Sequence, residues 1–97
     1  MTETKFSPGR LVATPGALEA MSESGQTAAY FLQRHLAGDW GEVSSDDWQL
    51  NEAALVDGSR LLSAYRTLKG KKLWIITEAA DDIGRRAATT LLLPDEY

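Results

Sequence analysis

The sequence predicts an α+β fold in which a three- to four-stranded antiparallel sheet has two or three helices packed on one face. The central observation is the stretch Lys72–Glu78 (KLWIITE), whose aromatic and β-branched side chains favour a strand over a helix. Strand-like runs lie on both sides of it, at Leu61–Leu68 and Ala87–Leu93. Upstream, between residues 14 and 58, apolar residues recur at helical spacing between capping residues and glycines.

The predicted strands are joined by links of very different length. Lys69-Gly70-Lys71 is short and contains glycine, which predicts a hairpin between the strand at 61–68 and the central strand. Ala79–Arg86 is long for a hairpin link and rich in charged residues, so we expect a mobile loop there. A further short strand at Gly9–Ala13 can extend the sheet at one edge.

Three helices are predicted from residues that start and stop them. Thr14 can cap free amides at the start of the first helix, and Pro15 fits the first helical position because its missing N–H has no partner there. Thr27 caps the second helix, and Ser44 or Ser45 caps the third. The expected ranges are 15–23, about 28–37 and about 45–56, and they end at Gly25, Gly38 and Gly58.

Composition narrows the possible functions. The chain has 97 residues, and we expect a flexible polar lead at residues 1–8 and one domain at 9–97. It has no cysteine and a single histidine, which excludes disulfides, cysteine nucleophiles and multi-histidine metal sites within one chain, and no cofactor is expected. No apolar run approaches the ~20 residues of a membrane helix, so we expect a cytoplasmic protein with no membrane contact. The formal charge of −4 weighs against nucleic acid as a partner.

His35 is the side chain whose ordinary pKa lies closest to neutrality, which makes it the first candidate for acid–base chemistry. It follows Arg34 and precedes Asp39, so one reading is a general acid or base. It also lies on or beside the apolar stripe of the second helix, so the other reading is a buried, hydrogen-bonded histidine. The sequence leaves both readings open.

Charge is segregated along the chain. Six acids and no Lys or Arg occur between His35 and Ser59, which predicts an acidic face that docks on a basic protein surface or, alternatively, a set of helix-capping acids. We assign partner binding to Asp46, Asp47 and Glu52. The positive residues of the sheet half predict a phosphate-binding edge, or charges that guard a hairpin and a loop tip. They are Lys69, Lys71, Lys72, Arg85 and Arg86. Contact between the acidic and basic regions of two copies would produce a homodimer.

Two further sequence features bear on the core. The three tryptophans, Trp40, Trp48 and Trp74, are expected in the core rather than in an aromatic ligand patch. Asn51 lies between Trp48 and Leu55 on the apolar face of the third helix, so we expect it to be buried and hydrogen-bonded to a neighbouring loop, such as the one at Asp39-Trp40-Gly41.

Several short motifs follow one another in order over residues 30–97. They are Asp39-Trp40-Gly41, Asn51-Glu52-x-Ala54-Leu55, Leu62-Ser63-x-Tyr65, Trp74-Ile75-Ile76-Thr77-Glu78-Ala79 and Thr89-Thr90-Leu91-Leu92-Leu93-Pro94-x-Glu96-Tyr97. In this combination the C-terminal two-thirds of the chain resembles a family of small uncharacterised proteins carried on bacterial plasmids and integrative elements. The chain departs from that family in the Ala80–Arg86 loop, which is longer here. The resemblance implies a bacterial, cytoplasmic product of a mobile element and brings no established activity.

The order of helices and strands also resembles small bacterial ribonuclease toxins of the barnase and RelE type. In those folds a histidine or another base on a helix works with arginine, threonine and tyrosine side chains of the sheet. The resemblance casts His35 as the base, with Arg66, Thr89, Thr90 and Tyr97 as its partners in the sheet. The acidic net charge counts against this enzyme, and likeness of fold alone does not carry function.

Two hypotheses about function follow from these observations. The first is a non-catalytic accessory protein that binds a macromolecular partner, expected to be a protein. The second is a small ribonuclease-like enzyme or toxin. Convergence of His35, Arg66 and Thr89 on an open concave surface would favour the enzyme, whereas burial of His35 against Trp40 or Trp48 would count against it.

Overall fold

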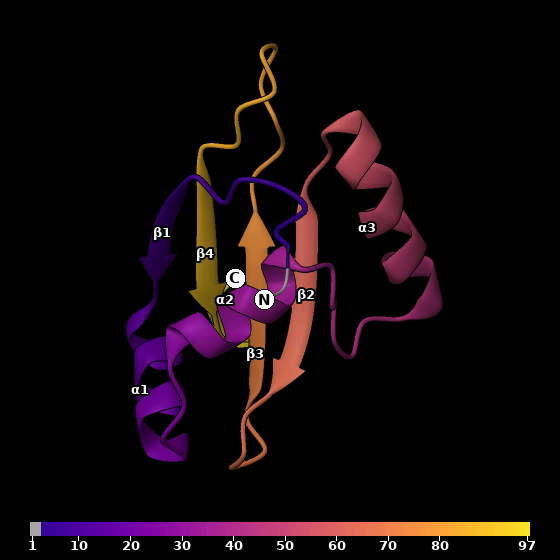
Figure 1. Ribbon diagram of the computed structural model, residues 1–97. Helices are drawn as coiled ribbons and strands as arrows, with labels where there is room; N and C mark the ends of the chain where they lie inside the picture. Colours follow the sequence, from indigo (N-terminus) through magenta and orange to yellow (C-terminus); the bar gives the residue numbers. More distant parts are fainter. Residues whose placement is uncertain (1–2) are drawn as a thin grey trace.

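The computed structural model describes residues 3–97 and has an α+β architecture, as the sequence predicted (Figure 1). Within that part of the chain, three helices accompany one four-stranded sheet. In chain order the elements are β1 (Arg10–Ala13), α1 (Pro15–Ser24), α2 (Ala28–Leu36), α3 (Ser45–Asp57), β2 (Leu61–Arg66), β3 (Lys72–Thr77), β4 (Ala88–Leu92) and the short 3₁₀ helix η1 (Pro94–Glu96).

The strand order is β1-β4-β3-β2, and β3 pairs in antiparallel fashion with both β2 and β4, so the prediction of a strand flanked on both sides is confirmed. The sheet is not wholly antiparallel, because β1 pairs with β4 in parallel. A tight turn forces two neighbouring strands to run antiparallel, but no turn joins β1 to β4. Their relative direction therefore depends on the whole fold, which the sequence pattern does not reveal.

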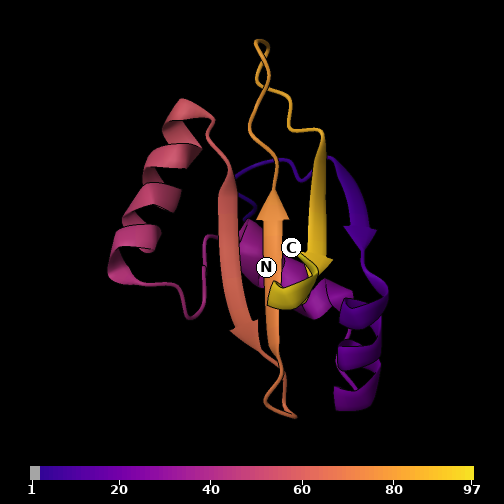
Figure 2. The same cartoon turned by 180° about the vertical axis from the view of Figure 1, so that it is seen from behind.

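Helix α2 crosses one face of the sheet, α1 lies next to it beyond the end of β1, and α3 lies alongside β2 (Figures 1 and 2). The opposite face is crossed by η1 (Figure 2). The main core lies between the sheet and the first two helices and consists of Ala17, Met21, Phe31, Leu32, Tyr65, Leu73, Ile75 and Leu91. A second cluster forms around Trp40, Ala54 and Leu61, where α3 packs beside β2. The sequence prediction of helices on one face therefore describes α1 and α2, while α3 covers an edge.

The segment before β1 lies against the domain from Lys5 onward, although the sequence predicted a flexible lead at residues 1–8. The Lys5 amide donates a hydrogen bond to the carbonyl of Leu36 at 2.7 Å. The Phe6 ring lies 5.2 Å from the imidazole of His35 and 6.2 Å from the indole of Trp40. One aromatic residue therefore ties this segment to the second cluster, and residues 1–2 of the expected lead lie outside the described part of the chain.

The loop before α3 and the side chain of Asn51 cover the outer edge of β2. The loop before α3 runs along it, with the Glu42 amide donating to the Ala64 carbonyl at 2.6 Å and the Ala64 amide donating to the Trp40 carbonyl at 3.0 Å. Next to this bridge, the Asn51 side chain donates to the Leu62 carbonyl at 2.7 Å and accepts from the Leu62 amide at 3.1 Å. An unpaired strand edge invites pairing with another chain, and these contacts block it.

Asn51 is buried and hydrogen-bonded, as predicted, but its partner is the backbone of β2 and not the loop at residues 39–41. We expect Asn51→Ala to lower the free energy of unfolding by about 2–4 kcal/mol, because a donor and an acceptor of Leu62 both lose their partner. Urea unfolding measures this loss. The matched control is Gln49→Ala, an exposed residue of the same helix, which should change stability by less than about 0.5 kcal/mol. Equal midpoints for the two variants would contradict this role of Asn51.

The link between β3 and β4, predicted to be a mobile loop, is a hydrogen-bonded extension of the hairpin. The Asp81 amide donates to the Arg85 carbonyl at 2.8 Å, and the Asp81 carboxylate accepts from the amides of Ile83 at 3.0 Å and Arg85 at 2.8 Å. An isolated bridge between Ala80 and Arg86 continues the ladder. The charged residues of this link therefore shape a turn of their own.

Candidate functional site

His35 projects from α2 into the interior, and its side chain is 0% exposed. The imidazole meets two aromatic rings edge to face, that of Phe6 at 5.2 Å and that of Trp40 at 5.6 Å between ring centroids. Of the two readings that the sequence left open, the structure matches the buried histidine. A functional role for this side chain must therefore be one that needs no contact with solvent or substrate.

The two imidazole nitrogens belong to a continuous chain of hydrogen bonds through the core. Nδ1 of His35 lies 2.5 Å from Oγ of Ser63, and Nε2 lies 2.8 Å from Oγ1 of Thr77. The Thr77 hydroxyl lies 2.7 Å from that of Thr89, which donates to the carbonyl of Pro8 at 2.7 Å. We call these five residues the buried polar chain. It joins α2, β2, β3, β4 and the segment before β1.

The direction of every proton in this chain follows from its end. A carbonyl accepts only, so the single hydroxyl proton of Thr89 is committed to Pro8. Thr77 must then donate to Thr89, and the Nε2–H of His35 must donate to Thr77. That leaves Nδ1 as an acceptor for the Ser63 hydroxyl. His35 is therefore neutral in the Nε2–H tautomer, and each of its two polar atoms has one partner.

Electrostatics reinforce the neutral state. The pKa of His35 is lowered from 6.5 to about 3, first by burial, because the imidazolium would lose its hydration, and second by the positive charge of Arg86. With this pKa, the imidazole stays neutral at neutral pH and keeps only its Nε2 proton. The imidazole also has no free lone pair, since Nδ1 already accepts from Ser63. His35 therefore acts as a structural pin, a buried side chain whose hydrogen bonds fix α2 to strands β2 and β3.

The residues assigned to a ribonuclease-like site do not converge. Thr89 joins His35 through Thr77 but is itself buried. Arg66 ends β2, where its guanidinium lies 3.4 Å from the carboxylate of Glu42. Tyr97 follows η1 on the opposite side of the sheet (Figure 2). Of this set, the fold therefore links only His35 and Thr89, and both are buried.

Thr90 also belonged to that set, and it lines a hollow of about 380 Å³ near η1. The hollow is shared with Arg60, Tyr97 and Glu96, which have partners inside the chain: Arg60 donates to the Tyr97 hydroxyl, and Glu96 accepts from the Thr14 hydroxyl at 2.5 Å. This hollow lies apart from the buried imidazole.

Two members of the buried polar chain, Ser63 and Thr77, were not singled out from the sequence. A signal for them exists, because side chains alternate across a strand. Thr77 shares a face of its strand with Leu73 and Ile75, and Ser63 is paired in register with Ile75. A hydroxyl on an apolar face requires a partner, and the single histidine of an amphipathic helix is a suitable one.

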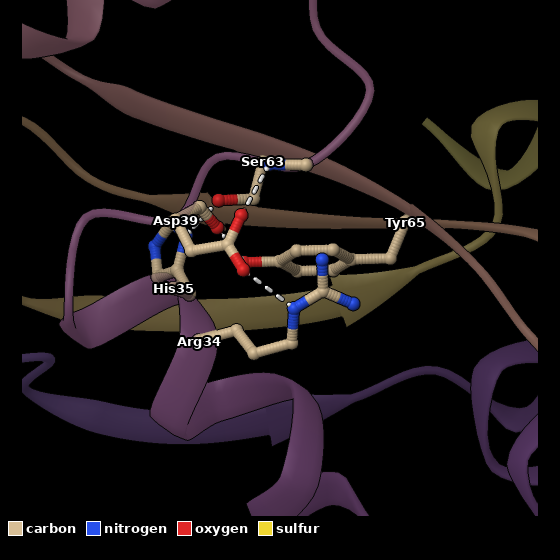
Figure 3. A network of polar contacts seen from close by, with 6 residues as sticks. Arg34, His35, Asp39, Ser63 and Tyr65 are labelled. Atoms are coloured by element: carbon tan, nitrogen blue, oxygen red, sulfur yellow. Dashed lines mark hydrogen bonds and ion pairs between the residues drawn. The ribbon is translucent and has the colours of Figure 1, made fainter. Parts of the chain in front are cut away.

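Asp39 does not work with His35, because it closes a second polar network at the end of α2 (Figure 3). Its carboxylate accepts from Nε of Arg34 at 2.8 Å, and its carbonyl accepts from the Tyr65 hydroxyl at 2.6 Å. The Arg34 guanidinium lies 4.5 Å above the centre of the Tyr65 ring. The bond to Asp39 raises the pKa of Arg34, and burial raises the pKa of Tyr65. These contacts hold both titratable groups in their ordinary charge states.

Arg86, expected at a phosphate-binding edge or a loop tip, holds the end of α3 in place. Its guanidinium donates to the carbonyls of Ser59 at 2.7 Å, Ala54 at 3.0 Å and Glu78 at 3.0 Å, and it lies 5.7 Å from the centre of the Phe6 ring. Cationic groups favour the C-terminal end of a helix, where carbonyls lack partners. Burial lowers the pKa of Arg86. This arginine has little capacity left for a phosphate.

The three acids assigned to partner binding differ in their surroundings. Glu52 accepts from the indole Nε1 of Trp40 at 2.8 Å, so it helps to hold a buried residue. Asp46 and Asp47 lie exposed in the first turn of α3, where negative charge suits the helix dipole. Between residues 3 and 97 the ion pairs are Arg34–Asp39 and Arg66–Glu42, so neither acid of the first turn is in one.

The outward surface of α3 exposes aliphatic side chains that the buried polar chain does not explain. The helix buries Asn51 and Ala54, and residues at helical spacing on its other side point to solvent. Leu50 is 66% exposed and Val56 is 91% exposed. We call this surface the α3 outer face and define it as Asp46, Gln49, Leu50, Ala53, Val56 and Asp57. It has an apolar centre with one acid near each end.

Residues 3–97 have no group of three or more histidine or acidic side chains placed to hold a metal ion. None of the helices in this span is long and apolar enough to cross a membrane.

The chain was compared with protein-family models, with curated proteins and with solved structures, and none of them matches it.

Proposed function

We propose that this chain is a non-catalytic accessory protein that binds another protein through the α3 outer face. The observation that carries the proposal is the exposure of two aliphatic side chains, Leu50 at 66% and Val56 at 91%, on a helix whose other side is already packed against β2. Apolar residues grouped on one exposed face are typical of an interaction site, whereas isolated ones are not.

The charges around the α3 outer face indicate which surface a partner should have. Asp46 lies near one end of the apolar centre and Asp57 near the other, and α3 contains no lysine or arginine. A fitting partner has an apolar groove with lysine or arginine on its rim. Complementary charges of this kind steer association and select the partner more than they add affinity. The expected complex therefore forms more slowly at high salt.

The surroundings of His35 also favour a binding function over a catalytic one. The single histidine is buried, neutral and already hydrogen-bonded at both nitrogens. A general base must reach the proton that it removes, and this imidazole reaches only hydroxyls of its own core. A binding role requires nothing from His35 beyond stability.

The test is a capture experiment with two matched variants. The native protein, Leu50→Ser/Val56→Ser and Leu18→Ser are tagged and expressed in cells of the natural host. Leu18 lies on α1 and is 54% exposed, so its variant makes the same kind of surface change elsewhere. We expect the native protein and Leu18→Ser to capture the same partner. The Leu50→Ser/Val56→Ser variant should bind that partner with an affinity at least about tenfold lower, as is typical when central interface residues are truncated.

Two results would contradict the proposal. One is an unchanged set of captured proteins when Leu50 and Val56 are both replaced, provided that the variant unfolds at the native midpoint. The other is cleavage of RNA or DNA by the purified native protein but not by a folded His35→Gln variant.

A further inference from the structure

We infer that a second copy of this chain occupies the α3 outer face, and that it does so through its β2–β3 turn. The inference rests on the proposed function, because it names the partner of the same face. The resulting contact is head to tail: the acidic, apolar helix of one copy meets the basic, apolar turn of the next.

The turn has the composition that the α3 outer face requires. Leu68 at its tip is 80% exposed, and Lys69, Lys71 and Lys72 around it are all exposed. We call these four residues the basic turn. A large aliphatic side chain among positive charges is the counterpart of an apolar centre between negative charges. Both surfaces occur on one chain.

The basic turn is also held in one shape. The Thr67 amide donates to the Lys71 carbonyl at 2.8 Å, and the Gly70 amide donates back to the Thr67 carbonyl at 2.8 Å. The Leu68 amide donates to the side chain of Gln26 at 2.9 Å, which ties the tip to the segment between α1 and α2. Leu68 is thus presented by an ordered backbone. A preorganised segment loses less conformational entropy when it binds.

The α3 outer face offers a seat for Leu68. Ala53 lies between Leu50 and Val56 on the exposed side of the helix, three residues from each. A small residue between two larger ones leaves a dip into which a neighbouring side chain packs. Asp46 and Asp57 lie about 16 Å apart along the helix axis, at a rise of about 1.5 Å per residue. The three lysines that follow Leu68 supply the positive charge that these two acids attract.

One chain does not bring its own two surfaces together. The outer face of α3 is turned away from the sheet, while the basic turn lies at the end of β2 and β3 (Figure 1). The two patches are also different, so the contact is heterologous, and in a pair one copy keeps a free basic turn while the other keeps a free α3 outer face. This property makes the inference testable by mixing variants.

The experiment uses sedimentation velocity of the full chain up to roughly 1 mM, a concentration at which weak association is detectable. We expect the native protein to self-associate, and Leu18→Ser to behave in the same way. Ala53→Arg fills the dip and repels the lysines, and Leu68→Ser removes the side chain that enters it. Both positions are exposed, so the fold is retained. Each variant alone is expected to associate at least about tenfold more weakly than the native protein.

An equimolar mixture of the two variants is the decisive sample. Ala53→Arg keeps an intact basic turn and Leu68→Ser keeps an intact α3 outer face, so the mixture should form a two-chain complex and stop there. Raising the salt from about 0.05 M to about 0.5 M should weaken it. A native protein that stays monomeric, or a mixture that stays monomeric while the native protein associates, overturns the inference. In both cases, loss of a captured partner by Leu50→Ser/Val56→Ser would still uphold the proposed function.

Discussion

Replacing His35 by alanine is expected to lower the free energy of unfolding by about 3–5 kcal/mol, measured by urea denaturation at neutral pH. The substitution removes a ring that is 0% exposed and leaves a cavity against Phe6 and Trp40. It also takes away the acceptor of Ser63 and the donor to Thr77, and both hydroxyls lie in the interior. A change below about 1 kcal/mol would mean that water replaces the imidazole and that the buried polar chain is not a structural pin.

The same residue predicts how stability depends on pH. His35 has a pKa of about 3 in the folded chain against 6.5 as its ordinary value. Below pH 6.5 the unfolded chain therefore binds a proton that the folded chain does not bind. The contribution of His35 to stability is complete above pH 6.5 and falls by about 1.4 kcal/mol per pH unit as the pH decreases towards the folded pKa.

His35→Gln serves as the matched variant for this pH dependence, because glutamine can donate and accept but does not titrate. Protonation of the carboxylates changes the stability of both proteins equally. The difference in unfolding free energy between native and variant therefore reports on the histidine alone. We expect that difference to shrink by about 2 kcal/mol between pH 6.5 and about pH 5. A constant difference over this range would show that the folded chain protonates His35 as easily as the unfolded chain.

Trp40→Ala is the second substitution with a large expected effect, a loss of about 3–5 kcal/mol in the free energy of unfolding. Trp40 is fully buried at the centre of the cluster between α3 and β2. Its indole contacts the rings of Phe6 and His35 and donates to Glu52 at 2.8 Å. The truncation therefore loosens three segments at once: the one before β1, the end of α2, and α3.

Trp74→Ala is the control of the same residue type. Trp74 lies on β3, on the face away from α1 and α2, and it is only partly buried, with its ring 6.1 Å from that of Tyr97. We expect it to cost about 1 kcal/mol. Chemical denaturation of the two variants side by side decides the ranking. A larger loss for Trp74→Ala would show that the face crossed by η1, and not the second cluster, contributes more to stability.

Most of the elements were predictable because their signals are local. Thr14, Thr27 and Ser44 each cap a helix by accepting a hydrogen bond from the amide three residues on, as expected from residue type alone. Gly25 and Gly58 end helices with left-handed backbone, with φ of 69° and 83°. The predicted boundaries of the strands agree with the observed ones within two residues.

The candidate site was only partly predictable. The apolar spacing of α2 placed His35 on or beside the buried stripe, which is where it lies. Its partners Ser63 and Thr77 are 28 and 42 residues further along the chain, so no local pattern connects them to it. Burial likewise separated residues that looked alike in sequence. Arg86 is half-buried beside Phe6, whereas Arg85 is exposed.

The sequence by itself determined the fold class, the order of the helices and strands, and the segregation of acidic from basic residues. Each of these depends on residue type, on caps and on spacings of a few residues. The tertiary structure alone decided that β1 runs parallel to β4, that Asn51 pairs with β2, and that the buried polar chain crosses the core. The physical reason is that buried polar groups must find partners wherever packing brings them, and packing joins segments that are distant along the chain.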